Sequence, residues 1–372
     1  MLPARYTYKY VNSLMFLIAS AASVWFSVLP TVLKRIRSVQ CSRAWSCAWS
    51  RIRSKSWWSR RWLMVLASLA LAACSNPTST PQNAAQADVT HTDSTQPVEQ
   101  QTSTLNIVSP DWGNAATLTA MGHAPIATGD VRVWDRWVGS PKLPNAITDL
   151  GIRYQPNAEL IAQLPVDMVI DNYFYEHARN LYGDVPAESV MFAAEGETAT
   201  WADYTEPTRK LGELIDNPAL AERYIDRSQQ DIARASKQLQ QRYPNVKKFA
   251  VIQFADANNM RMYVVNSLFK PALDGMNREL VVLGKGNNWG FVPIRMGDLA
   301  QLDDETCLLI IDPLSPITRA EIKDSLIWQR LGYGETRCVG ELPPVWIYGG
   351  MSSLVSLANN LSDVSLKGGP VL

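Results

Sequence analysis

A chain of 372 residues, 47% of them hydrophobic, is long enough for two ordinary domains with a sizeable core. Its formal net charge of zero hides an asymmetry, because residues 1–61 carry eleven Lys or Arg and no Asp or Glu. Residues 74–372 therefore keep 24 basic against 35 acidic residues, and this net charge of −11 argues against a nucleic acid partner, whose phosphates require a basic surface.

The N-terminal region resembles a targeting segment. Arg60 and Arg61 precede an uncharged apolar run over 63–73 that is too short for an ordinary membrane span. It ends in Leu-Ala-Ala-Cys74, which resembles the bacterial lipobox, whose Cys is acylated and becomes the new N-terminus. We expect residues 1–73 to be an N-terminal extension with a lipoprotein signal peptide, and Cys74 to be the lipidated residue. The alternative is a plain signal peptide followed by an incidental cysteine.

Two further segments flank this signal. Residues 11–33 form an uncharged run followed by basic residues, which is typical of a membrane span. The other explanation, which we favour because one signal suffices for export, is a start codon assigned too far upstream. Residues 74–104 are rich in Thr, Gln, Pro and Ser and contain no aromatic residue, so they are predicted to be a disordered tether.

An N-terminal lobe is expected over 105–216. Strands are predicted at 105–108, 124–128 and 167–170, with helices at 114–121 and from 156 onward. Short helices that alternate with strands indicate an α/β lobe with a mainly parallel sheet.

A long connecting helix is predicted over 217–243. Asn217 is a good N-cap before Pro218, and Pro244 ends the pattern. Apolar residues recur every seven positions along one face. Such a helix spans roughly 37 Å at 1.5 Å per residue, so it could join two lobes.

A C-terminal lobe is expected over 244–372, with strands at 248–254, 262–265, 280–283 and 308–311 and a final helix at 351–361. The predicted fold class is therefore α/β, with two lobes of mainly parallel sheet joined by one long rigid helix.

Three enzymatic or metal-binding interpretations are unsupported. The glycines at 284, 286 and 290 imitate a dinucleotide-binding turn, but Pro293 disfavours the helix that such a turn requires. No Gly-x-Ser-x-Gly elbow accompanies Ser352, and the three histidines lack metal-ligand spacing. We therefore expect no enzyme, no protein-bound metal and no cofactor.

Aromatic residues occur instead in four loop segments: Trp134 and Trp137, residues 173–175, Trp289, and Trp346 with Tyr348. Each ring alone could equally belong to a core. Together they lie where predicted strands end, and open α/β sheets bind ligands at the carboxyl ends of their strands.

These segments resemble the periplasmic ferric-hydroxamate (ferrichrome-type) siderophore-binding proteins of ABC importers. The similarity covers about residues 104–365 and depends on the order of these motifs: Trp137-Val138 with Pro141-x-Leu143-Pro144, residues 149–153 (DLGIR), Pro156-Asn157-x-Glu159-Leu160, residues 266–269 (NSLF) and residues 344–349 (PVWIYG). The resemblance implies two lobes bridged by a long helix, with the ligand in an aromatic groove between them.

The resemblance also implies roles for individual residues. Arg153 would donate hydrogen bonds to the hydroxamate oxygens around the iron, assisted by Tyr173 or Tyr175, although a gapless match lands on Phe174. The groove-lining aromatics would be Trp137, Trp289, Trp346 and Tyr348, with Ile347 in place of a frequent aromatic. The iron would be bound only through the siderophore, and the protein is expected to be a monomer.

The implied partner is an ABC permease, which would dock on carboxylates of the two lobes at Glu159 and Asp298. The protein would be lipid-anchored in the periplasm or on the outer face of the cytoplasmic membrane. Alternatives are a binding protein for another iron chelate, haem or cobalamin, an anchored hydrolase, or a structural lipoprotein. A strongly anionic catecholate complex would require several basic residues, and the loops offer chiefly Arg153.

Cys307 and Cys338 are the two cysteines that follow the lipobox. In an oxidising compartment they could form a disulfide, with adjacent parallel strands bringing them together, or they could remain buried thiols.

Overall fold

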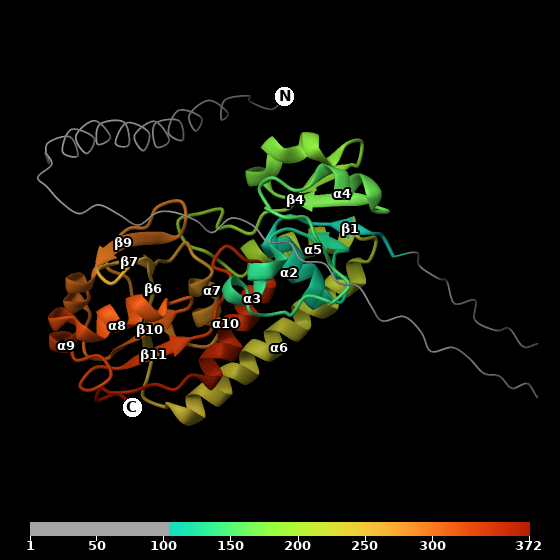
Figure 1. Cartoon of the computed structure of the whole chain (residues 1–372). Coiled ribbons are helices and arrows are strands. Elements are labelled where there is room, and N and C mark those ends of the chain that lie inside the picture. The colour runs from blue at the N-terminus through green and yellow to red at the C-terminus, as the bar shows by residue number, and fades with distance from the viewer. Residues whose placement is uncertain (1–103) are drawn as a thin grey trace, which may run out of the picture. The chain divides into compact units, whose positions relative to one another are not determined.

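The structure, a computed structural model, describes residues 104–372, which fold into two α/β lobes (Figure 1). This confirms the predicted fold class. The predicted signal region, Cys74 and the tether before Thr104 lie outside the described residues. Among the helices of residues 104–372, none is both long and apolar enough to cross a membrane.

The sheet of the first lobe has five short strands in the order β3-β2-β1-β4-β5, and every pairing is parallel. The strands are β1 (Ile107–Val108), β2 (Ala127–Thr128), β3 (Thr148–Asp149), β4 (Met168–Asp171) and β5 (Ala187–Ser189). The connecting helices are α2 (Trp112–Met121), η1 (Val131–Val133), α3 (Trp134–Trp137), α4 (Ala158–Gln163) and η2 (Tyr173–Tyr182), and α5 (Ala202–Leu214) follows the last strand.

The sheet of the second lobe is mixed. Its strands are β6 (Lys248–Phe254), β7 (Asn259–Tyr263), β8 (Glu279–Leu280), β9 (Phe291–Arg295), β10 (Thr306–Ile311) and β11 (Val339–Leu342). β6, β8, β10 and β11 pair in parallel, whereas β7 pairs antiparallel with both β6 and β9. The link from β6 to β7 is too short for a parallel crossover, so the chain forms a hairpin there.

The predicted long helix is α6 (Pro218–Arg242), 25 residues in length. Its N-terminus is capped by Asn217, whose side-chain oxygen accepts the N–H of Leu220 at 3.1 Å. In Figure 1 the helix runs alongside both lobes, and it packs on α2 and α5 of the first lobe and on α7 (Phe269–Gly275) and α10 (Met351–Asp363) of the second part of the chain.

One hydrophobic core extends through both lobes. It includes Ile107 and Leu118 of the first lobe, Ile232 of α6, and Phe249 and Leu309 of the second sheet. The C-terminal helix α10 contributes Leu354 to this core and contacts α2, so it returns to the first lobe. The opposite face of the second sheet is covered by η3 (Met296–Gln301), α8 (Pro316–Asp324) and α9 (Leu326–Leu331), which enclose a separate core.

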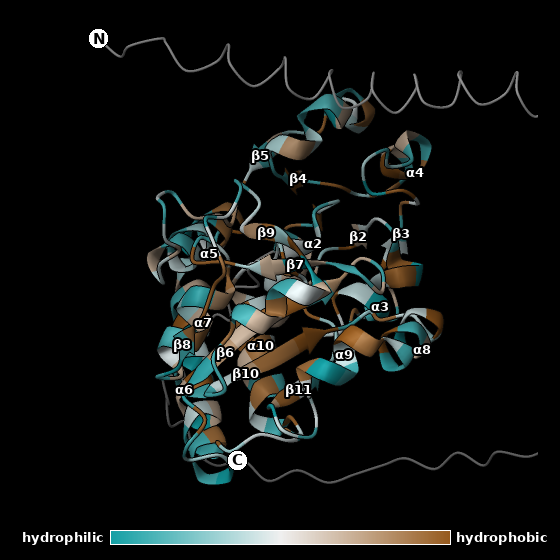
Figure 2. Ribbon diagram, turned by 90° about the vertical axis from the view of Figure 1, so that its left-hand side faces the viewer, coloured by the Kyte–Doolittle hydropathy of each residue, from teal (hydrophilic) through white to brown (hydrophobic). Residues whose placement is uncertain are grey.

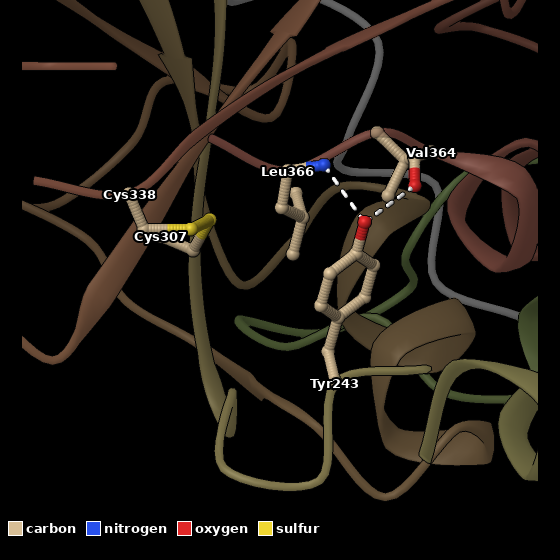
Figure 3. Close-up of a disulfide and its surroundings, with 5 residues drawn as sticks. All are labelled: Tyr243, Cys307, Cys338, Val364 and Leu366. Atoms are coloured by element: carbon tan, nitrogen blue, oxygen red, sulfur yellow. Dashed lines mark hydrogen bonds between the residues drawn. A yellow bond between two sulfur atoms is a disulfide. The ribbon is translucent and has the colours of Figure 1, made fainter. Parts of the chain in front are cut away.

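Cys307 and Cys338 form a disulfide in the structure (Figure 3). Cys307 lies in β10, a fully buried strand that is coloured as hydrophobic in Figure 2, and Cys338 immediately precedes β11. The two strands are parallel neighbours, and the N–H of Leu308 donates to the carbonyl of Cys338 at 3.0 Å. Beside the disulfide, the Tyr243 hydroxyl donates to Val364 O at 3.2 Å and accepts the N–H of Leu366 at 3.1 Å, which ties the end of α6 to the segment after α10.

Candidate binding site

Two adjoining cavities lie between the lobes, and we call them together the interlobe groove. The first, of about 220 Å³, is lined by Tyr154 and residues 172–175 from the first lobe and by residues 266–268, Asn288 and Trp289 from the second. The second, of about 320 Å³, contains Trp137 and Arg153 of the first lobe and Gln253 and Arg261 of the second. Residues 346–348 line both cavities.

The Arg153 guanidinium is packed against aromatic rings. Its central carbon lies 3.9 Å from the ring centre of Trp112 and 4.8 Å from those of both Tyr154 and Trp346. One terminal nitrogen donates to the Tyr154 hydroxyl at 3.2 Å, while Nε is buried without a hydrogen-bond partner among residues 104–372. The rings thus fix the orientation of the guanidinium, whose remaining N–H groups can donate to a ligand.

The backbone places Arg153 through a close approach to Gly129. A Cβ atom at Gly129 would lie 2.5 Å from the Arg153 Cα, so only glycine fits there. The next residue, Asp130, accepts the N–H of Arg153 at 3.2 Å through Oδ2 and donates its own N–H to Gly151 O at 2.6 Å. The loop after β3 is therefore clamped to the loop after β2.

A series of aromatic contacts crosses the groove from one lobe to the other. Phe174 stacks on Trp289 at 5.1 Å, and Trp289 meets Tyr348 edge-on at 5.7 Å. Tyr348 and Trp346 are 5.6 Å apart, and Trp346 contacts Trp112 at 4.9 Å. These rings line the groove with apolar surface from both lobes.

All seven residues predicted to bind ligand line the groove: Arg153 and Trp137 in the second cavity, Tyr173, Tyr175 and Trp289 in the first, and Trp346 and Tyr348 in both. The two candidate tyrosines differ, because Tyr173 is 54% exposed whereas Tyr175 is 2% exposed and stacked on Tyr154. Phe174, the gapless match, also lines the first cavity. Burial raises the pKa of Tyr173 and of Tyr348, so both hydroxyls are protonated and able to donate.

The two predicted docking carboxylates lie outside both cavities. Glu159 is exposed in the first turn of α4. Asp298 is half-buried, and its Oδ2 accepts the N–H of Arg295 at 2.8 Å. Asp298 therefore caps η3, which is a structural task in addition to any contact with a partner.

Sequence reasoning missed Asp111, a buried carboxylate that lines the first cavity. It caps α2 by accepting the N–H of Asn114 at 2.8 Å, and it accepts from the Asn172 side chain at 2.9 Å. Asn172 in turn accepts the N–H of Phe174 at 3.0 Å. Asp111 thus links α2 to the segment that carries Tyr173 and Phe174. The available signal was an N-cap residue three positions before the helix predicted at 114–121, which in the structure begins at Trp112.

Burial raises the pKa of Asp111 to about 6, although the hydrogen bond from Asn114 and the Arg153 charge partly oppose this. Because the pKa of Asp111 is raised in the folded state, its protonated carboxyl contributes to the stability of the folded protein. This contribution is fully present below the ordinary pKa of 3.8 and is lost as the pH rises through about 6. We expect the unfolding free energy of the wild type, relative to Asp111→Asn, to fall by about 2 kcal/mol between pH 4 and pH 7. Urea denaturation of both proteins across this range measures the difference, and a difference independent of pH would contradict the prediction.

Sequence reasoning also missed Arg261 and Gln253, because it considered loops whereas these residues lie on β7 and β6. Within residues 104–372 no cluster of three or more His, Cys, Asp or Glu side chains is arranged to hold a metal ion.

Comparison with known proteins places this geometry in context. The family model described as "Periplasmic binding protein" matches residues 107–309. The Iron(3+)-hydroxamate-binding protein FhuD of Escherichia coli (strain K12) is 23% identical over 264 residues, which cover 69% of this chain and 86% of that protein.

Two solved structures share the fold. The siderophore-binding protein FhuD from Vibrio cholerae, bound to Fe3+–Desferal, matches with a TM-score of 0.63 and 21% identity and covers 70% of this chain and 97% of its own. A periplasmic heme-binding protein from Pseudomonas aeruginosa matches with a TM-score of 0.53 and 17% identity and covers 72% of this chain and 96% of its own.

Proposed function

The chain belongs to the periplasmic binding protein family, and on this basis we propose that it captures a ferric siderophore, of the hydroxamate type, and delivers it to an ABC permease. It is a binding protein and not an enzyme.

One observation carries the proposal: a guanidinium held by three aromatic rings lines a cavity between two lobes. A ferric hydroxamate presents negatively polarised oxygens on one face and apolar carbon elsewhere. Arg153 offers a fixed fork of donors to such oxygens. The rings of Trp289, Trp346 and Tyr348 can cover the carbon with little loss of side-chain entropy. Because the siderophore supplies the iron ligands, the protein needs none of its own.

Haem is the second candidate, since a relative of the same fold is named for it. A haem iron is ordinarily held by an axial His, Cys, Met or Tyr side chain. Neither His123 nor His177 lines the groove, so an axial ligand would have to come from a Tyr or Met of the first cavity, such as Tyr173, Tyr154 or Met191. The guanidinium of Arg153, held among three aromatic rings, favours the hydroxamate.

A titration of tryptophan fluorescence tests the choice, since Trp289 and Trp346 lie in the groove. The panel contains a ferric trihydroxamate, a ferric catecholate, haem and cobalamin, with the iron-free trihydroxamate as control. We expect saturable quenching at one ferric trihydroxamate per protein. Binding of haem without any binding of the hydroxamate would overturn the proposal in favour of haem.

We further propose that Cys74 is lipidated and holds the protein at the outer face of the cytoplasmic membrane or in the periplasm. The support is the lipobox-like segment that ends at Cys74. An intact mass of the exported protein that corresponds to an unmodified Cys74 would exclude the anchor.

Docking to the permease is proposed to use Glu159, with Asp298 as the weaker candidate on the second lobe. The exposed side chain of Glu159 is free to meet a basic partner surface, so we expect Glu159→Lys to reduce cellular uptake of the ferric chelate severalfold. Glu213→Lys, the same change at an exposed position of α5, is the matched control. Purified Glu159→Lys should keep wild-type ligand affinity, and undiminished uptake by this variant would refute the docking role.

A further inference from the structure

A second arginine lines the groove from the other lobe. Arg261 lies on β7, where Met260 and Met262 on either side of it are buried in the core beneath the sheet. Alternation along a strand therefore directs Arg261 to the opposite face, where it lines the second cavity together with Arg153. Its guanidinium lies 5.0 Å from the ring centre of Phe291 and is half-buried.

Neither arginine is neutralised by an ion pair within residues 104–372. The second cavity is lined by two arginines and one carboxylate, Asp130, so its lining carries a net charge of +1. Asp130 already accepts the N–H of Arg153 through Oδ2. The other nearby carboxylate, Asp111, lies in the first cavity and is held by Asn114 and Asn172.

Gln253 adds an uncharged donor to the same cavity. It is the direct cross-strand partner of Arg261, and its Oε1 accepts the Tyr263 hydroxyl at 3.0 Å. This bond leaves the amide nitrogen of Gln253 as the group that can donate. The cavity thus combines two guanidiniums from opposite lobes with an amide, a donor set that suits a carboxylate better than a neutral or cationic group.

We propose that the second cavity recognises an anionic group, a carboxylate that the ferric chelate carries in addition to its hydroxamates, held between Arg153 and Arg261. This inference rests on the proposed function and narrows the ligand class to anionic chelates. Arg261 would then determine specificity for the carboxylate, because it adds a second guanidinium to the cavity that Arg153 lines.

Two ferric complexes with the same three hydroxamates but different terminal charges test the effect of ligand charge separately from that of iron coordination. Desferal forms a linear ferric trihydroxamate with a terminal ammonium, and acylation of that amine with succinic anhydride replaces the ammonium with a carboxylate while leaving the three hydroxamates unchanged. We expect the wild type to bind the succinylated ferric complex at least about tenfold more tightly than ferric Desferal, as one charge-assisted contact implies.

Arg261→Gln should reduce this preference to near unity. Arg330→Gln, which removes the same charge from an exposed position of α9, is the control and should keep the wild-type preference. A thermal melt of each variant verifies folding. Equal affinities of the wild type for the two complexes, or a preference that persists in Arg261→Gln, would overturn the inference and leave the proposed function standing. Failure of the wild type to bind either complex would instead count against the proposed function itself.

Discussion

Replacing Arg153 with alanine is expected to weaken the binding of a ferric hydroxamate about ten- to hundredfold, because a charge-assisted hydrogen bond contributes about 1.5–3 kcal/mol. Arg153→Lys should recover only part of the affinity, since an ammonium lacks the planar fork that the rings of Trp112, Tyr154 and Trp346 hold in place. Tryptophan fluorescence titration of each variant gives the dissociation constants.

The matched control is Arg132→Ala. Arg132 belongs to the same lobe and has a 77% exposed side chain that pairs with Asp149 at 3.7 Å, outside both cavities. It should retain wild-type affinity. Arg153→Ala also loses the contacts with three rings, so the unfolding free energy of this variant should fall by about 1 kcal/mol. Titration well below its melting temperature ensures that the measured affinity refers to folded protein. Wild-type affinity in Arg153→Ala would remove the central support for a hydroxamate ligand.

Reduction of the Cys307–Cys338 disulfide is expected to lower the unfolding free energy by about 3–4 kcal/mol in the chain-entropy model. The bond closes a loop of 31 residues in sequence and joins neighbouring strands of the second sheet. Urea denaturation of the oxidised and the dithiothreitol-treated protein measures this loss of unfolding free energy without any change of side chain. Ligand affinity should be the same in both forms, because neither cysteine lines the groove.

The double variant Cys307→Ala/Cys338→Ala should resemble the reduced protein and should not respond to reductant. Thiol labelling of the denatured, non-reduced wild type gives an independent check, since a disulfide leaves no reactive thiol in this pair. Two labelled cysteines, or identical denaturation midpoints with and without reductant, would contradict the bond.

The fold was predictable from sequence where a local pattern was strong. The N-cap at Asn217 and the stop before Pro244 delimit α6 to within a residue, and the apolar run at 248–254 is β6. The antiparallel hairpin was not predicted, and Pro293 was used only as an argument against a helix, so no strand was predicted around it. This segment is the edge strand β9, where a residue without an N–H is tolerated.

The groove was predictable in composition but not in arrangement. Loop position and family resemblance together indicated Arg153 and groove aromatics that are distant in sequence, such as Trp289 and Trp346. They did not indicate Trp112 and Tyr154, whose rings pack on the Arg153 guanidinium. They could not indicate that Tyr175 is buried against Tyr154 while Phe174 reaches Trp289 in the opposite lobe. Asp111 and Arg261 were missed because a helix cap and a strand residue have ordinary local explanations, and only the tertiary fold brings them to the groove.

The hydrophobic core that the two lobes share limits the conformational changes by which the protein could indicate that a ligand is bound. Rotating the lobes apart would open this shared core, and each 200 Å² of newly exposed apolar surface costs about 5 kcal/mol. On the proposed function, the ligand would then bind a preformed surface, and little of the binding free energy would be consumed by closure. On the same proposal, a permease that distinguishes the loaded protein from the empty one would have to contact the ligand itself and groove residues such as Phe174 and Trp289.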